Sequence, residues 1–262
     1  MSLRICPLAS GSRGNAVWVE ADGVAMLVDC GLGPRVLEQR LAARGFDRRR
    51  LAAVLVTHEH FDHIGGLGQF TGARRVALRM TRGTLRGSAA LAGASGLRVE
   101  AEHAFAVGPL TVTPLAIPHD AGEPVAYRFA AGGAAALILT DLGEADALPA
   151  WALRDLDYLL IEANHDERRL REGPYPAFLK ARIAGASGHL SNAQCGELLA
   201  RIVALSPRLR RVTLGHLSET NNDAGLAVET VWAGLEARPG AASPLTVEVA
   251  TQREPGVIWE SR

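Results

Sequence analysis

The sequence lacks the features of an exported or membrane-spanning protein. Its 262 residues contain no apolar run near the roughly 20 residues that a bilayer-spanning helix needs. The first ten residues, Met1–Ser10, hold no apolar stretch long enough for a signal peptide. We therefore expect a cytoplasmic protein without a membrane partner.

Cysteine is scarce, and its spacing fits neither a metal site nor a disulfide framework. Cys6, Cys30 and Cys195 are far apart in the sequence and form no C-x-x-C pair. Scattered cysteines in a reducing compartment are usually buried thiols. The sequence thus indicates neither a thiolate metal site nor a structural disulfide.

The chain also lacks net charge. Lysine and arginine together number 28, as do aspartate and glutamate, so no global positive field points to nucleic acid. One local stretch is basic, and it comprises Arg74, Arg75, Arg79, Arg82 and Arg86. This stretch has two interpretations, a phosphate-binding surface or an ordinary solvated face, and the sequence favours neither.

The order of the apolar segments predicts an α/β fold. Short apolar runs such as Val24–Val28 and Ala52–Val56 alternate with amphipathic patterns such as Pro34–Arg44. A strand meander between Val107 and Leu139 precedes further strand–helix pairs, including a helix over Asn192–Leu205 with Asn192 as its N-cap. We expect a single domain, residues 1–262, in which two mixed β-sheets pack together between helices as an αββα sandwich.

Four side chains that commonly bind metals lie within six residues. His58, His60, Asp62 and His63 directly follow a wholly apolar strand, and open α/β sheets place ligand sites at such strand ends. Imidazole and carboxylate are ligands that zinc, manganese and iron favour. In an extended segment His58 and His60 point the same way and can bind one ion, whereas Asp62 and His63 can bind a second after a turn. A solvated polar loop does not account for this clustering.

The segment His58-x-His60-x-Asp62-His63 resembles the H-x-H-x-D-H motif of metallo-β-lactamase-fold hydrolases. The other motif positions of that family are found in order after strands, at Asp29, His119, Asp141 and His216. The resemblance implies that His58, His60 and His119 bind a first metal and that Asp62, His63 and His216 bind a second. It also implies that Asp141 bridges the two ions and that Asp29 hydrogen-bonds behind the ligands.

A pair of divalent ions, zinc or manganese with iron as a further candidate, supports hydrolysis. Two such ions roughly 3.5–4 Å apart lower the pKa of a bound water toward about 7 and neutralise charge on a phosphodiester or ester oxygen. Asp62 is accordingly a catalytic residue as well as a ligand.

Two further segments narrow the reaction. Leu159-Leu-Ile-Glu-Ala163 and Gly188-His-Leu-Ser-Asn192 resemble the catalytic glutamate and histidine segments of ribonuclease Z. This resemblance implies that Glu162 orients His189 and that His189 donates a proton to the leaving group. The alternative is that Glu162 only ends a strand and His189 only precedes a helix.

The whole set of segments is most similar to the YycJ/WalJ-like family, which is associated with 5′ to 3′ exonuclease activity on DNA. The chain has neither an inserted β-CASP domain nor a long arm for holding tRNA, so DNA is favoured over RNA as the substrate. Expected substrate-binding residues are Ser12, Asn15, Lys180, Arg182 and His165, and for His165 the alternative is an ordinary surface histidine. The alternative function is a hydrolase of lactones, thioesters or cyclic phosphodiesters, which needs only the metal ligands. The sequence does not indicate an oligomeric state.

Overall fold

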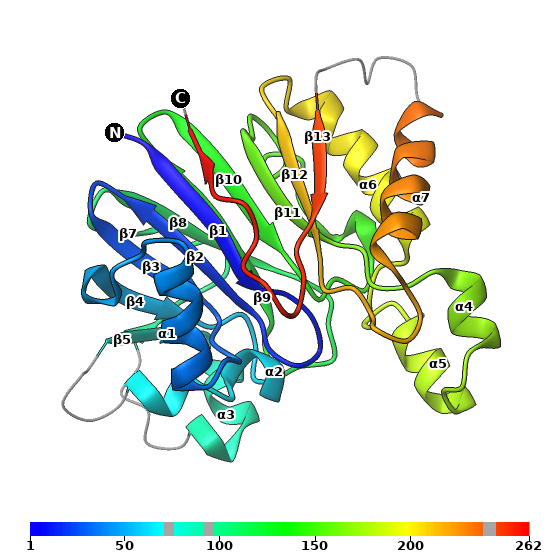
Figure 1. Cartoon of the computed structure of the whole chain (residues 1–262), viewed down its shortest axis with the longest axis horizontal. Helices are drawn as coiled ribbons and strands as arrows, with labels where there is room; N and C mark the ends of the chain where they lie inside the picture. Colours follow the sequence, from blue (N-terminus) through cyan, green and yellow to red (C-terminus); the bar gives the residue numbers. More distant parts are fainter. Residues whose placement is uncertain (71–75, 92–96, 238–244, 262) are drawn as a thin grey trace. The chain divides into compact units, whose positions relative to one another are not determined.

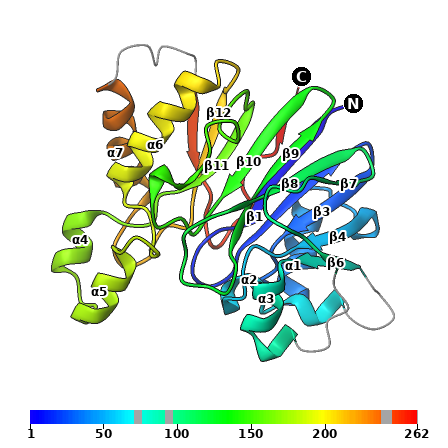
Figure 2. The same cartoon turned by 180° about the vertical axis from the view of Figure 1, so that it is seen from behind.

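The computed structural model, shown in Figures 1 and 2, describes residues 1–70, 76–91, 97–237 and 245–261. The chain forms two compact units: unit 1 is Met1–Ala116, Ala121–Ala134 and Ala250–Arg262, and unit 2 is Ile117–Asp120 and Ala135–Val249. The strands belong to two seven-stranded sheets flanked by helices, which confirms the predicted α/β class. No helix among the described residues is long and apolar enough to cross a bilayer.

The first sheet lies entirely in unit 1, with strand order β14-β1-β2-β3-β4-β5-β6. Its strands are β1 (Leu3–Ala9), β2 (Ala16–Ala21), β3 (Val24–Val28), β4 (Leu51–Leu55), β5 (Ala77–Met80), β6 (Leu97–Arg98) and β14 (Trp259–Glu260). Strands β1 to β3 are antiparallel hairpins, whereas β3 to β6 run parallel. The carboxyl ends of β3 and β4 therefore meet at one edge of the sheet, which is where the sequence places Asp29 and residues 58–63, called here the histidine loop.

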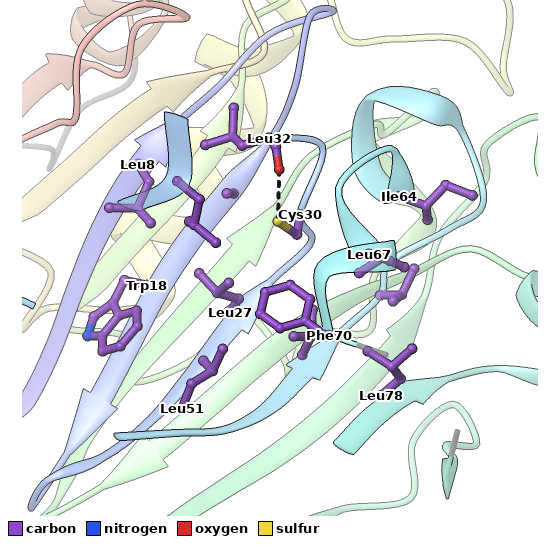
Figure 3. Packing of buried hydrophobic residues seen from close by; sticks show 14 of the residues in the cluster. Leu8, Trp18, Leu27, Cys30, Leu32, Leu51, Ile64, Leu67, Phe70 and Leu78 are labelled. Atoms are coloured by element: carbon purple, nitrogen blue, oxygen red, sulfur yellow. Dashed lines mark hydrogen bonds between the residues drawn. The ribbon is translucent and has the colours of Figure 1, made fainter. Parts of the chain in front are cut away.

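Helices of unit 1 cover one face of this sheet. They are α1 (Pro34–Ala43), α2 (Phe61–Ile64) and α3 (Arg82–Gly87), with 3-10 turns η1 (Arg48–Arg50), η2 (Leu67–Phe70) and η4 (Ala89–Leu91). Figure 3 shows the buried cluster beneath them, in which Trp18, Leu27 and Phe70 lie among other apolar side chains. The Cys30 thiol lies in this cluster, 3.5 Å from the Leu32 carbonyl. This packing fixes the segment that follows β3.

Unit 1 also contains an antiparallel meander, formed by β7 (Phe105–Val107), β8 (Leu110–Ala116) and β9 (Val125–Ala131). The Tyr127 hydroxyl donates to the Val56 carbonyl at 2.9 Å, and the Val125 amide donates to the Thr57 carbonyl at 3.0 Å. The meander thus holds the chain at the point where β4 ends and the histidine loop begins.

The second seven-stranded sheet has the strand order β13-β12-β11-β10-β9-β8-β7. Its strands β10 (Ala134–Leu139), β11 (Tyr158–Glu162), β12 (Arg211–Gly215) and β13 (Thr246–Val249) run parallel to one another. The helices of unit 2 are α4 (Glu167–Glu172), α5 (Ala177–Ile183), α6 (Asn192–Leu205) and α7 (Ala224–Glu236), with a 3-10 turn η5 (Ala145–Ala147). The carboxyl ends of β10, β11 and β12 lie at one edge, so the residues after them are brought together.

Helix α6 begins at the predicted residue but has a different cap. Ser191, and not Asn192, is the N-cap, because its hydroxyl accepts from the Gln194 amide while the Gln194 side chain accepts from the Ser191 amide. This reciprocal arrangement is a capping box, and it satisfies two otherwise unpaired backbone donors. The prediction of Asn192 as the cap was wrong by one residue.

Helices α6 and α7 lie side by side in unit 2 (Figures 1 and 2) and approach closely at two glycines. A Cβ built on Gly234 would lie 3.1 Å from the Gly196 Cα, and one built on Gly196 would lie 3.2 Å from the Val231 carbonyl oxygen. The absence of side chains at this crossing therefore sets the distance between the helices.

We expect Gly234→Leu to lower the free energy of unfolding by about 1–3 kcal/mol, because the added side chain overpacks the crossing of α6 and α7. Ala233→Leu is the matched control, since Ala233 is exposed on the neighbouring position of α7. Urea denaturation of both variants measures the difference. Equal midpoints for the two variants would show that the crossing tolerates bulk.

Candidate active site

The histidine loop of unit 1 starts at His58, three residues after the end of β4, and runs into α2, whose N-cap is His60. The His58 ring lies at the centre of the loop, with its centroid 4.5 Å from that of His60 and 4.0 Å from that of His63. His58 and His63 are buried, whereas His60 and Asp62 are partly exposed. The loop therefore gathers three imidazoles and one carboxylate in unit 1.

Asp29 supports one of these imidazoles, that of His63. Its carboxylate is buried and accepts from the Thr57 amide and the Thr57 hydroxyl, each at 2.8 Å. The Nδ1 atom of His63 lies 2.8 Å from the same carboxylate. Asp29 thus orients the ring of His63, and it also holds the chain after β4 through Thr57.

The hydroxyl of Thr57 determines the tautomer of His58. It has one proton, which it donates to Asp29, so it can only accept from the His58 Nδ1 atom at 3.0 Å. In His58 and His63 alike, a proton therefore lies on Nδ1, and Nε2 is the ring nitrogen that could bind a metal.

Asn15, expected to contact substrate, lies buried beneath the histidine loop. Its side-chain oxygen accepts from the Gly11 amide, and its Nδ2 atom donates to the Asp62 carboxylate at 3.0 Å. Its backbone amide donates to the Asp62 carbonyl at 2.8 Å. A Cβ at Gly31 would lie 1.8 Å from that carbonyl, so only glycine fits there. Ser12, on the same turn, is exposed.

The strand ends of unit 2 gather a second cluster. Asp141 follows β10, Glu162 ends β11 and His216 follows β12. The His189 ring lies 5.1 Å from that of His119 and 5.2 Å from that of His216, measured between centroids. Asp141, Glu162, His189 and His216 can each offer one ligand atom within 4.8 Å of the others.

Glu162 is fully buried and accepts four hydrogen bonds. Its Oε1 atom accepts from Nδ1 of both His189 and His216, each at 2.8 Å. Its Oε2 atom accepts from the backbone amides of Leu142 at 3.0 Å and Leu190 at 3.3 Å. Because these donors occupy both oxygens, Glu162 acts as a support for the two histidines and is not a metal ligand.

The two supported histidines and His119 share one pattern. His119 directs Nδ1 to the Gly188 carbonyl at 3.1 Å, as His189 and His216 direct theirs to Glu162. Each of the three rings therefore donates through Nδ1, so Nε2 is the ring nitrogen that could bind a metal or carry a second proton.

Burial and neighbouring charges shift the pKa values of this cluster in opposite directions. Burial acts to raise the pKa of Glu162, but the charge of His189 and the hydrogen bonds from His189 and His216 lower it well below its usual range. Burial acts to lower the pKa of His189, yet the charge and hydrogen bond of Glu162 raise it overall. For His119 burial dominates, and its pKa is lowered.

Three site residues have left-handed backbone conformations. Asp29, Asp141 and His216 have φ values of 59°, 58° and 54°. Such angles are uncommon outside glycine and are enriched in Asp, Asn and His. All three residues lie within two residues of the end of the strand that positions them, where the strain turns the side chain out of the sheet direction.

The donor set fits divalent metal ions. The side chains that could hold an ion include His58, His60, Asp62, His63, His119, Asp141 and His216. Neutral imidazole and carboxylate suit zinc, manganese and iron alike, so this set does not select one of them. Burial raises the pKa of Cys30 to about 12 and that of Cys195 further, and neither thiol is a candidate ligand.

The other residues expected to bind substrate lie on or near α4 and α5 of unit 2. His165 is buried, and its Nδ1 atom has no hydrogen-bond partner in the part of the chain that the structure describes. Lys180 donates through Nζ to the Arg171 carbonyl at 2.8 Å, and the Nε atom of Arg182 pairs with the carboxylate of Asp120. Of the basic stretch, Arg74 and Arg75 lie outside the described residues.

Sequence reasoning missed an asparagine network in unit 2. Asn192 and Asn222 exchange side-chain hydrogen bonds at 3.0 and 2.8 Å, and Asn164 donates to the His216 carbonyl at 2.8 Å. The network joins the segments that carry His189, Glu162 and His216. The sequence did contain a signal for this network, because each of the three segments has an asparagine a few residues after its catalytic or ligand side chain.

The model of the metallo-beta-lactamase superfamily matches residues 9–216, which include every motif position discussed above. The chain belongs to the metallo-beta-lactamase superfamily. Among solved structures, YhfI from Bacillus subtilis, a metallo-beta-lactamase fold protein, is similar with a TM-score of 0.72 and 17% identity, and the match covers 100% of each chain. That likeness supports the fold.

Two curated relatives are similar over most of this metallo-beta-lactamase chain. Exodeoxyribonuclease WalJ of Streptococcus pneumoniae serotype 2 is 34% identical over 230 residues, 86% of this chain and 85% of the relative. Exodeoxyribonuclease YycJ of Bacillus anthracis is 30% identical over 242 residues, 90% of each protein. The chain is thus a member of the family that contains these proteins, as its segments predicted.

A shorter match supports the predicted likeness to ribonuclease Z. Ribonuclease Z of Mycolicibacterium paratuberculosis is 47% identical over 63 residues, which are 24% of this chain and 21% of the relative. The similarity is therefore confined to part of the chain, whereas that to the WalJ and YycJ relatives extends over most of it.

We expect Asp29→Asn to weaken metal binding by about 10- to 100-fold, because the neutral amide supports His63 and Thr57 less well than the carboxylate. Asparagine tolerates the left-handed backbone as aspartate does. Asp22→Asn is the matched control, since Asp22 also has a positive φ of 45° but an exposed side chain. Competition with a chromogenic chelator measures the affinity, and equal affinities in both variants would contradict the role of Asp29.

Proposed function

We propose that this protein is a binuclear metal-dependent phosphodiesterase that degrades DNA from the 5′ end. The observation that carries this proposal is the hydrogen bond of 2.8 Å between Glu162 and His189, beside His119, Asp141 and His216 in unit 2. A metal hydrolase acting on activated small substrates needs no such pair. The names of the relatives WalJ and YycJ, exodeoxyribonucleases, support the same substrate class.

The order of the family motif assigns the ligands. We propose that a first divalent ion is held by His58, His60 and His119, a second by Asp62, His63 and His216, and that Asp141 serves both. When bound, the ions would activate water and neutralise charge on the scissile phosphate. Because the family model spans both units, it also supports the expectation that residues 1–262 constitute one domain.

The chain's own residues would move the proton and hold the strand. His189 would donate a proton to the leaving 3′ oxygen through Nε2, because its Nδ1 atom is held by Glu162. Lys180 and Arg182 would contact phosphate, and Arg182 presents its two amino groups while Nε pairs with Asp120. Asp62, whose carboxylate Asn15 orients, is the catalytic residue of the histidine loop.

The alternative function is hydrolysis of a lactone, thioester or cyclic phosphodiester. The metal ligands alone would suffice for it. Burying the charge of Glu162 costs free energy of desolvation. If the protein hydrolysed only such small substrates, the support of His216 would be the only role left for Glu162. We therefore favour the phosphodiesterase.

The test of the proposal is a comparison of substrates with the fully metallated enzyme. We expect 5′-phosphorylated single- and double-stranded DNA to be shortened from the 5′ end at a kcat/KM far above that for thioesters and lactones. End-labelled DNA and RNA resolved on gels give the polarity and the sugar preference, while elemental analysis verifies about two ions per chain. Efficient thioester hydrolysis with intact DNA would establish the alternative.

We expect His189→Ala to lower DNA cleavage by about 10²- to 10⁴-fold without loss of metal, since positioned proton transfer has that magnitude. A nitrophenyl phosphodiester has a leaving group that needs no proton, so the variant should cleave it nearly as fast as the unmodified enzyme. Equal losses on both substrates would make His189 a binding residue, and loss of metal would make it a ligand.

Glu162→Gln should behave differently from His189→Ala. Glutamine replaces one acceptor oxygen by a donor, so two of the four donors around Glu162 would face an NH2 group. Because His216 is one of the groups that Glu162 holds, we expect this variant to lose metal affinity as well as DNA cleavage. Retention of metal with loss of DNA cleavage alone would separate the two roles of Glu162.

A further inference from the structure

Helices α4 and α5 form a small projection of unit 2, to one side of its sheet (Figures 1 and 2). Helix α5 contains no buried residue. The side chain of Phe178 on this helix is 75% exposed, although a phenylalanine is normally inside a protein. No packing within the described residues accounts for an aromatic ring at this position.

The exposed face of α5 has a regular composition. Phe178, Ala181 and Arg182 are all exposed, and their spacing of three and four residues places them on one side of the helix. Leu179 and Ile183 are partly buried on the other side. The face thus presents an aromatic ring and a guanidinium one turn apart, with the small Ala181 between them.

The charge of the projection is positive. Its basic residues are Arg168, Arg169, Arg171, Lys180 and Arg182, and its acidic residues are Glu167 and Glu172. Arg169 pairs with Asp223 and Glu167 with the Ser191 hydroxyl, so these groups are engaged within unit 2. Arg168 is exposed and forms no ion pair among the described residues. Its charge is available to an external anion.

Helix α5 leads directly to the proposed proton donor. The Ile183 carbonyl at its end accepts from the His189 amide at 2.8 Å. Arg182 pairs with Asp120, the residue next to His119, and the Asp120 amide donates to the Ser187 carbonyl at 3.0 Å. A chain lying along the exposed face of α5 would therefore reach the His119–His189 cluster within unit 2.

We propose that the exposed face of α5, with Arg168 of α4, binds a single-stranded stretch of the nucleic-acid substrate. This inference rests on the proposed function and adds to it the surface that holds the strand. Phe178 stacks on a base, and Arg168 and Arg182 contact phosphates. Basic side chains interleaved with an exposed aromatic ring are the arrangement that single strands require, because every base offers a π-face and every nucleotide a charge.

The experiment measures binding of a 5′-phosphorylated, phosphorothioate-linked oligonucleotide of about 12 nucleotides to the metallated enzyme by fluorescence anisotropy. We expect Phe178→Ala to raise the Kd by about fivefold or more, and Phe178→Trp to preserve it with quenching of the added indole emission on binding. Trp151→Ala is the matched control, since Trp151 is a 46% exposed aromatic residue of unit 2 outside α4 and α5. Its Kd should stay within about twofold of the unmodified value.

Salt dependence separates the charged from the aromatic contacts. Arg168→Ala should lower the slope of log affinity against log salt by about 0.7, the value for one phosphate of a single strand. Phe178→Ala should leave the slope unchanged. Thermal melting of each variant verifies that the fold is retained.

Three results would overturn the inference in distinguishable ways. If the unmodified enzyme neither binds nor cleaves nucleic acid, the proposed function fails and the inference with it. If the enzyme cleaves DNA but Phe178→Ala and Arg168→Ala bind as the unmodified protein does, only the inference fails. If Phe178→Ala loses binding to anionic phospholipid vesicles while oligonucleotide binding persists, the surface binds membranes instead.

Discussion

The buried carboxylate of Glu162 is the interaction on which the rest of the unit 2 cluster depends. A charge without solvent contact is tolerated only when donors surround it, and four donors from three places in the sequence meet at this carboxylate. Two are backbone amides, in the loop after β10 and in the segment before α6. The same group that orients two imidazoles therefore also holds the loops that carry Asp141 and His189.

Asp29 performs the corresponding task in unit 1. It too is a buried carboxylate at the end of a strand, and it too combines a backbone amide with an imidazole Nδ1. Each unit thus contains one carboxylate that selects the tautomer of its histidines before any metal arrives. Preorganisation of this kind reduces the reorganisation needed on metal binding and keeps the ligand rings in one orientation.

Much of this organisation is local and could be predicted from the sequence. The strands before Asp29 and His58 are apolar runs, and the cluster of metal-binding side chains at residues 58–63 is evident from their spacing. The other ligand positions were implied by the family resemblance. The second bond of Glu162 could not be predicted, because His216 is 54 residues further along the chain. Asn15 resembled a substrate contact in the sequence, whereas its position beneath Asp62 depends on the close approach at Gly31.

The N-cap of α6 was predicted one residue too late, at Asn192 instead of Ser191. Serine and asparagine have nearly equal preference for the N-cap, so propensity alone did not distinguish Ser191 from Asn192. The spacing Ser191-x-x-Gln194 carried the deciding signal, a capping box. The amide of Asn192 is meanwhile committed to Asn222, a tertiary contact that no local pattern reveals. The exposed Phe178 was overlooked because periodicity describes what is buried and not what is left outside.

The left-handed backbone at Asp141 and His216 limits how this scaffold can diverge. Replacement of either residue by glutamate or cysteine, which would suit other metals, would place a less tolerant side chain at a φ near 55–60° and cost roughly 1–2 kcal/mol. Exchange among Asp, Asn and His carries a smaller penalty. His60, with a φ of −63°, is under no such restriction. New metal specificities are therefore more accessible by substitution in the histidine loop than at the strand ends of unit 2.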